Sequence, residues 1–207
     1  MTKNTHLATG VALATAIIMP SDMRSLAVCI CGAAIGSTIS DVDVASSKPR
    51  KELNTIVGIS VTAIAILIML EVIFKIGIYQ LIESQTGLYR TLLGFVTFLL
   101  LSIYGTTTKH RSYTHSVIGI MTFTGAICII LPSMALSFCL GMISHVLLDI
   151  LNTKKVKVLY PYKKFGIALK LCHSDGKANM LIGIISTLVF VIELVIYALL
   201  KMHLISH

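Results

Sequence analysis

The sequence has few charged residues. Only 13% of its 207 residues are Asp, Glu, Lys or Arg, whereas about a quarter of residues are charged in soluble globular proteins. Hydrophobic residues make up 56% of the chain, and its mean hydropathy is +0.89. This composition excludes an ordinary soluble domain and predicts an integral membrane protein.

Linkers, repeats and paired cysteines are also missing. No Pro/Gly/Ser-rich or low-complexity stretch divides the chain, so we predict a single membrane-embedded domain over residues 1–207. The five cysteines include no C-x-x-C pair that could bind zinc or form a redox couple, and we interpret them as small hydrophobic residues. Pro20, Asp22 and Arg24 interrupt the apolar run before Cys29, which argues against lipoprotein processing there.

Long apolar runs account for most of the sequence. A helix needs about 20 apolar residues to cross a bilayer, with a range of roughly 17–25. Residues 55–74, 88–104 and 180–200 reach this length, and residues 116–151 form a longer run that Pro132 divides into a helical hairpin. Two shorter runs, 7–19 and 25–39, form either a shallow hairpin or two further spans. We therefore predict an all-α fold, a polytopic membrane helical bundle of about six to seven helices with short loops.

Basic residues are distributed unevenly between the loops. If each helix crosses the membrane once, segments 1–5, 40–54, 106–114 and 152–179 share one side and hold most of the 17 Lys and Arg residues. Cytoplasmic loops typically carry such an excess, so these segments are predicted to be cytoplasmic. The net charge of +8 thus indicates topology, and no nucleic-acid partner is expected. The basic 154–177 loop could also lie against anionic lipid headgroups.

Histidines and aspartates gather at the cytoplasmic helix ends. Such groups are costly at membrane depth and are usually buried toward a bundle interior, where they pair with each other or bind an ion. We therefore predict one site built from His6, Asp41, Asp43, His110, His115, His145 and Asp149.

The spacing of these residues supports a shared site. His145 and Asp149 are four residues apart, which places them on one face of a helix. Asp41 and Asp43 are two residues apart, which would align both carboxylates if the segment is extended.

A divalent metal suits this set of side chains. Four imidazoles and three carboxylates without clustered thiolates favour zinc, manganese or iron, because calcium and magnesium prefer oxygen ligands alone. We expect zinc in particular. Seven candidate ligands exceed the three or four that one catalytic zinc takes, so the site could hold one or two ions.

Simpler interpretations exist for each residue separately. His6 could sit at the headgroup boundary, and the "DVD" segment could cap a turn. His145 and Asp149 could form an intrahelical polar pair. The "HRSYTHS" segment could be a loop whose Thr114 caps the next helix, although that leaves its two histidines without a role.

Four motifs carry a resemblance to a known family. The segments "THLATG", "SDVD", "HRSYTHS" and "GMISHVLLDIL" occur in this order between His6 and about Pro161. They resemble the YdjM-like family of bacterial inner-membrane proteins, which are LexA-regulated and described as metal-dependent hydrolases. The resemblance implies a multi-pass protein of the bacterial inner membrane. The site residues that it implies are His6, Asp41, Asp43, His110, His115, His145 and Asp149, with Arg111 adjacent.

The chain departs from the family pattern at one position. Family members often have a histidine directly after the second aspartate, where this sequence has Val44. One potential ligand or proton carrier is therefore missing. A more distant similarity to zinc-dependent phospholipase C and P1-type nucleases implies phosphoester chemistry.

The predicted function is a membrane-bound metal-dependent hydrolase that acts on a phosphoester or lipid-linked substrate. The metal ligands would come from His6, Asp41, Asp43, His115, His145 and Asp149. His110 or His115 could serve as general acid, because imidazole titrates near neutral pH. Arg111 could present a bidentate fork to a phosphate. Membrane lipids are the expected partners, because the site lies at the membrane surface.

Two other functions remain open. A metal-independent enzyme similar to phosphatidic acid phosphatases would also use H-x-x-x-D, but its P-S-G-H motif is absent from the sequence. A metal or small-solute transporter would place ionisable residues along several helices. The spans here contain chiefly Glu71 and Glu193, both near the opposite face, which argues against a transporter.

Overall fold

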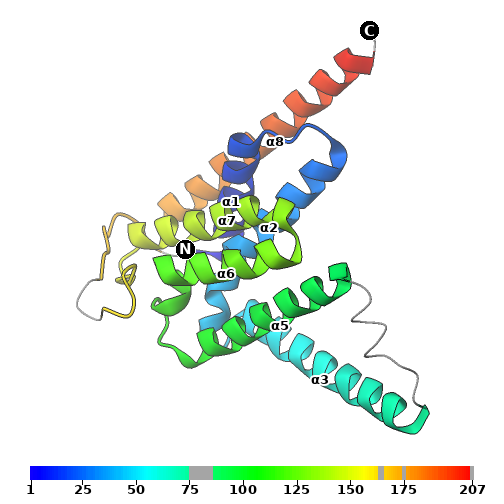
Figure 1. Cartoon of the computed structure of the whole chain (residues 1–207). Helices are drawn as coiled ribbons and strands as arrows, with labels where there is room; N and C mark the ends of the chain where they lie inside the picture. The colour runs from blue at the N-terminus through cyan, green and yellow to red at the C-terminus, as the bar shows by residue number, and fades with distance from the viewer. Residues whose placement is uncertain (75–85, 163–165, 174–175, 206–207) are drawn as a thin grey trace.

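The fold is a bundle in which the helix Pro132–Leu151 packs against three others, Lys3–Ile18, Met23–Ile39 and Val117–Ile130. The structure is a computed structural model that describes residues 1–74, 86–162, 166–173 and 176–205. This part of the chain holds seven α-helices and no strand, which confirms the predicted all-α bundle (Figure 1). The helices are α1 (Lys3–Ile18), α2 (Met23–Ile39), α3 (Lys48–Phe74), α5 (Thr86–Thr107), α6 (Val117–Ile130), α7 (Pro132–Leu151) and α8 (Lys177–Ile205).

Short polar residues begin several of these helices. The Asp22 carboxylate accepts from the Ser25 N–H at 2.9 Å, and the Ser25 hydroxyl in turn caps the Asp22 backbone, a capping box that starts α2. Pro132 opens α7, so the helical hairpin predicted at this residue is confirmed. Ser116 caps α6 by accepting from the Gly119 N–H at 3.1 Å. The alternative interpretation of Thr114 as the cap does not hold, because Thr114 lies inside a 3₁₀ turn, η2 (Tyr113–His115).

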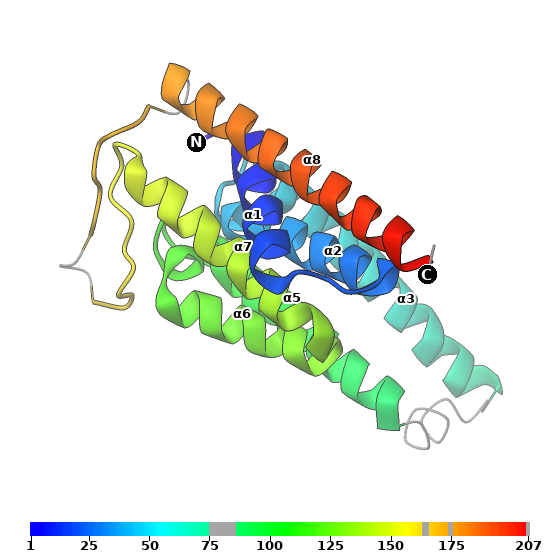
Figure 2. The same cartoon turned by 90° about the horizontal axis from the view of Figure 1, so that it is seen from above.

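Small residues let α1, α2 and α7 approach each other closely. An added methyl carbon at Gly36 would lie 2.1 Å from the carbonyl oxygen of Phe138, and one at Gly141 would lie 2.4 Å from that of Ala33. Helix association in membranes depends on such close backbone packing. Figure 2 shows α8 lying along α1 on one side of this core, with α5 and α6 on the other.

Four helices are long and apolar enough to cross a membrane. They cover Met23–Asp43, Gly87–Thr107, Pro132–Leu151 and Lys177–Lys201, while α6 is apolar but shorter. Most side chains of α8 are not buried, so they are available to lipid. The predicted run 55–74 is helical and lies within α3, although many of its side chains, Glu71 included, lie outside the described residues.

The helix ends predicted to share one side lie together. The Thr2 N–H donates to Oδ1 of Asn179 at 3.2 Å, which joins the starts of α1 and α8. The Val117 N–H donates to the Val158 carbonyl at 3.0 Å, which ties the start of α6 to the 152–176 connection. Parts of that connection, residues 163–165 and 174–175, lie outside the described residues. This end of the bundle carries the candidate site.

Candidate metal centre

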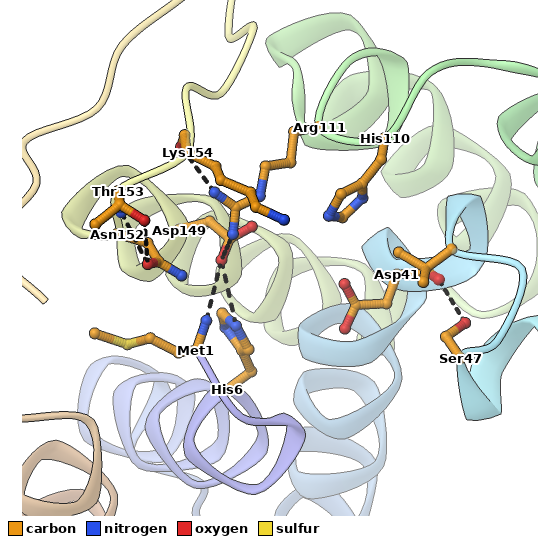
Figure 3. Close-up of a pocket in the computed structure, with 11 residues that line it drawn as sticks. Met1, His6, Asp41, Ser47, His110, Arg111, Asp149, Asn152, Thr153 and Lys154 are labelled. Carbon is orange, nitrogen blue, oxygen red and sulfur yellow. Dashed lines mark hydrogen bonds and ion pairs between the residues drawn. The ribbon is translucent and has the colours of Figure 1, made fainter. Parts of the chain in front are cut away.

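Four separate segments bring the predicted site residues together. His6 comes from the first turns of α1, and Asp41 and Asp43 lie in a 3₁₀ turn, η1 (Ser40–Asp43), that continues α2. The turn between α5 and α6 contributes residues 110–115, and α7 contributes His145 and Asp149. A cavity of about 240 Å³ opens at this place (Figure 3). Its lining includes Met1, His6, Asp41, Val44, Ser47, His110, Arg111, Asp149, Asn152, Thr153 and Lys154.

His145 is fixed with one nitrogen facing the centre of the site. Its ring is fully buried, and Nδ1 donates to the carbonyl oxygen of Ser37 at 2.7 Å. That bond places the proton of the neutral ring on Nδ1 and leaves a lone pair on Nε2. Nε2 finds no hydrogen-bond partner in the described part of the chain and lies 3.6 Å from Oδ1 of Asp41. The ring also stacks on His6, with centroids 3.9 Å apart.

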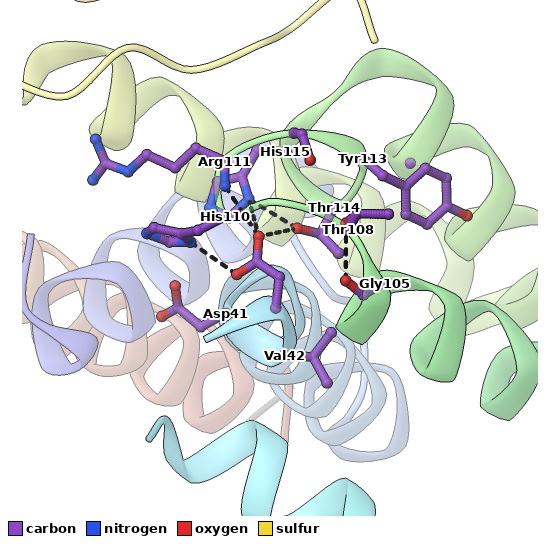
Figure 4. A network of polar contacts seen from close by, with 12 residues as sticks. Asp41, Val42, Gly105, Thr108, His110, Arg111, Tyr113, Thr114 and His115 are labelled. Atoms are coloured by element: carbon purple, nitrogen blue, oxygen red, sulfur yellow. Dashed lines mark hydrogen bonds and ion pairs between the residues drawn. The ribbon is translucent and has the colours of Figure 1, made fainter. Parts of the chain in front are cut away.

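His115 is held in the same way through a hydroxyl. Thr114 donates to Oδ2 of Asp43 at 2.9 Å, so its oxygen is free to accept from Nδ1 of His115, also at 2.9 Å (Figure 4). Nε2 of His115 makes no hydrogen bond with any described residue and lies 3.4 Å from Oδ2 of Asp149. A buried nitrogen oriented by its ring partner and left without a donor or acceptor is typical of a histidine metal ligand.

Asp43 organises the loop before α6. Oδ1 accepts from Nδ1 of His110 at 2.9 Å, while Oδ2 accepts from the backbone N–H of Arg111 at 3.1 Å and from Thr114. Asp41 points instead toward His145, so the two carboxylates do not align as an extended segment would align them. The reason is that η1 has three residues per turn, which turns positions two apart to different sides.

Asp149 is held by Arg111. Nη2 of Arg111 donates to Oδ1 of Asp149 at 2.9 Å, and Nη1 donates to the carbonyl oxygen of Lys154 at 2.7 Å. Nε2 of His6 lies 3.6 Å from the same Asp149 oxygen. Arg111 has a backbone φ of 61° and a buried side chain, so the loop accepts an unfavourable backbone conformation at this residue. Arg111 thus positions a carboxylate, and its predicted contact with a phosphate stays a prediction.

The donor atoms fall into three overlapping sets. One set is His6, His145 and Asp149, a second is Asp41, His115 and His145, and a third is Asp43, His110 and His115. Within each set the candidate ligand atoms lie within 4.8 Å of one another. His145 and His115 each belong to two sets, so the arrangement could accommodate one ion or two neighbouring ions.

The carboxylates of the site favour positive charge on His115. Burial lowers the pKa of His115, but the carboxylates of Asp149 and Asp43 outweigh that effect and raise the pKa to about 9. A proton and a metal ion would therefore compete for Nε2 of His115.

The sequence alone does not reveal the part that several residues play in the site. Thr114 offered only a simpler interpretation as a helix cap, and the carbonyl of Ser37 carries no side-chain signal at all. His110 differs from the other site histidines because 39% of its side chain is exposed, whereas those of His115 and His145 are fully buried. Val44, where family members often have a histidine, lines the cavity.

The fold and this polar centre define a polytopic helical membrane protein with a buried histidine–aspartate cluster at one end of its bundle. The sequence profile of the YdjM inner membrane protein family matches residues 1–205, and the chain belongs to this family. Neither the comparison with curated proteins nor the comparison with solved structures gives a significant match.

Proposed function

We propose that this protein is a metal-dependent hydrolase of the bacterial inner membrane that acts on a phosphoester or lipid-linked substrate at the cytoplasmic face. One observation supports this most strongly. Nε2 of His115 and Nε2 of His145 are buried and make no hydrogen bond to a described residue, although Nδ1 of each ring is oriented by a partner. Leaving two buried polar nitrogens unsatisfied is costly, and a bound divalent cation removes that cost.

The proposed ligands are those whose donor atoms lie close to one another in the first two sets. His115 and His145 supply nitrogens, Asp41 and Asp149 supply oxygens, and His6 completes the first set. Zinc is the preferred ion because imidazole and carboxylate ligands match its chemistry, while manganese and iron suit the same donors. When bound, such an ion supplies a hydroxide nucleophile near neutral pH and polarises the bond to be cleaved.

Asp43 has a different role in this proposal. Its two oxygens already accept three hydrogen bonds, from His110, the Arg111 backbone and Thr114. We therefore assign Asp43 to positioning His115 and the surrounding loop.

His110 is the proposed general acid. It lines the cavity, it is the most exposed histidine of the site, and its Nδ1 contacts Asp43 at 2.9 Å. That contact orients the ring, and when the imidazole is protonated its Nε2 can donate a proton to a leaving group. Arg111 keeps Asp149 in place, and the unpaired Nε of its guanidinium leaves hydrogen-bonding capacity for an anionic substrate.

The test is hydrolysis of lipid phosphoesters by the purified protein in lipid nanodiscs. Phosphatidic acid and a polyprenyl phosphate are the first substrates, with inorganic phosphate release as the readout. Turnover should stop with a chelator, return with zinc or manganese, and be lost in His145→Ala. The matched control is His173→Ala, which removes an exposed histidine from the same end of the bundle.

This assay and an uptake measurement separate the hydrolase from the phosphatase and transporter alternatives. Turnover that persists in the chelator would favour a metal-independent phosphatase and overturn the metal requirement. Metal uptake into proteoliposomes without turnover would favour a transporter. A transporter would place ionisable residues along several helices. Within the described residues, Glu193 is the one acidic side chain inside a candidate span away from the metal centre, and it accepts a hydrogen bond from Thr15 on α1.

A further inference from the structure

A second cavity, of about 300 Å³, lies beside the candidate metal centre. The turn 109–112 contributes to both cavities: His110 and Arg111 line the first, whereas Lys109 and Ser112 line the second. The complete lining of the second cavity is Tyr104, Thr107, Thr108, Lys109, Ser112, Lys157, Tyr160 and Pro161. It includes two lysines and no carboxylate.

We propose that this second cavity binds the phosphate of an anionic phospholipid headgroup. Neither Lys109 nor Lys157 forms an ion pair with any carboxylate of the described residues. Two lysines that line one cavity and have no ion-pair partner among the described residues create a positive potential, which attracts a phosphate near an anionic membrane surface. This site is independent of the metal centre and goes beyond the proposed hydrolase function.

The cavity lies at the depth where lipid headgroups are found. The candidate membrane span of α5 is Gly87–Thr107, and the cavity is built around its last turn. The hydroxyls of Tyr104 and Tyr160 are hydrogen-bonded to each other at 2.9 Å. Tyrosines are enriched at this level of membrane proteins because an apolar ring and a polar hydroxyl suit the interface.

The lysines and one tyrosine hydroxyl are the donors available to a phosphate. The hydroxyls of Thr107, Thr108 and Ser112 already donate to backbone carbonyl oxygens. One hydrogen of the tyrosine pair remains free, because only one of the two hydroxyls can donate to the other. Two ammonium groups and one phenol are therefore left to donate hydrogen bonds to phosphate oxygens of the ligand.

Neighbouring apolar side chains favour a lipid over free phosphate. Leu159 and Tyr162 flank the lining residues Tyr160 and Pro161, and they are 49% and 72% exposed. Exposed apolar groups next to lysines are the pattern of a segment that dips into the headgroup and acyl boundary. A phospholipid would cover these side chains with its acyl chains, whereas inorganic phosphate would leave them in water.

The experiment is native mass spectrometry of the detergent-purified chain titrated with phosphatidylglycerol or phosphatidylcholine. A lysine near an anionic surface contributes about fivefold in affinity, so Lys109→Ala/Lys157→Ala should bind phosphatidylglycerol about 30-fold more weakly. Tyr160→Phe should show a smaller loss. The control Lys48→Ala/Lys51→Ala removes the same charge from exposed positions on α3 and should bind like wild type.

Three results would overturn the proposal. These are an equal loss in the control variant, equal retention of phosphatidylcholine by wild type, and displacement of phosphatidylglycerol by millimolar inorganic phosphate. The last result would identify a site for free phosphate. Circular dichroism and metal content of the variants, measured in parallel, confirm the fold and show that failure of this site leaves the metal centre untouched.

Discussion

Replacing Thr114 by valine tests whether the hydroxyl that holds Nδ1 of His115 controls metal binding. Thr114 is fully buried, donates to Asp43 and accepts from Nδ1 of His115, both at 2.9 Å. Valine has nearly the same shape and keeps the methyl group that packs near Gly105, so the substitution removes the hydroxyl with little change in volume. It leaves Nδ1 of His115 without its acceptor and Asp43 with one donor fewer.

The lost contacts set the expected change in the free energy of unfolding and in metal affinity. A hydrogen bond to a charged group contributes about 1.5–3 kcal/mol, and the unpaired groups left behind are buried, so we expect the free energy of unfolding to fall by about 2–3 kcal/mol. That corresponds to a decrease in Tm of roughly 5–10 °C for a chain of this size. Loss of the group that orients a metal-binding histidine typically weakens metal affinity about 10–100-fold.

The assay is zinc competition against a fluorescent chelator, with thermal unfolding measured on the same samples. Thr91→Val is the matched control, because its exposed hydroxyl merely donates to the Gly87 carbonyl in the helix. Thr114→Ser restores the hydroxyl and should recover most of the affinity. Wild-type zinc affinity in a folded Thr114→Val variant would refute the role assigned to this residue.

Three further substitutions separate packing, positioning and ligation. Gly141→Ala should destabilise the protein by about 1–3 kcal/mol in thermal unfolding, because the added methyl carbon would meet the Ala33 carbonyl. The control Gly125→Ala adds its methyl group to open space and should raise the stability by up to about 1 kcal/mol through helix propensity. Arg111→Lys should lower the Tm, because an ammonium cannot reproduce the paired contacts with Asp149 and the Lys154 carbonyl. Asp41→Asn should weaken zinc affinity at least tenfold in the competition assay with nearly unchanged Tm, because its carboxylate has no structural hydrogen bond among the described residues.

The helices and the grouping of the polar residues could be predicted from the sequence. Apolar length and Pro132 located the spans and the α6–α7 hairpin, because a bilayer constrains helix length and proline starts a helix readily. The excess of basic residues in alternate loops predicted which helix ends lie together. The four-residue spacing of His145 and Asp149 correctly predicted that they reach one set of donor atoms.

The internal order of the site could not be predicted in the same way. The backbone of η1 decides that Asp41 faces His145 while Asp43 faces the 110–115 loop, and a two-residue spacing alone does not specify that turn. The carbonyl of Ser37 orients His145 across 108 positions of sequence. Thr114 and Ser116 are both good capping residues, and only the extended backbone at Ser116 selects it as the cap.

The most direct test of the central claim is the metal content of the purified protein by inductively coupled plasma mass spectrometry. Wild type, His145→Ala and His173→Ala should be prepared in parallel, exposed to zinc or manganese, and freed of loosely bound ions. Wild type and His173→Ala should retain one or two ions per chain, and a folded His145→Ala variant should retain almost none. A metal-free wild type, or a His145→Ala variant with undiminished metal, would contradict the assignment of this cluster as a metal centre.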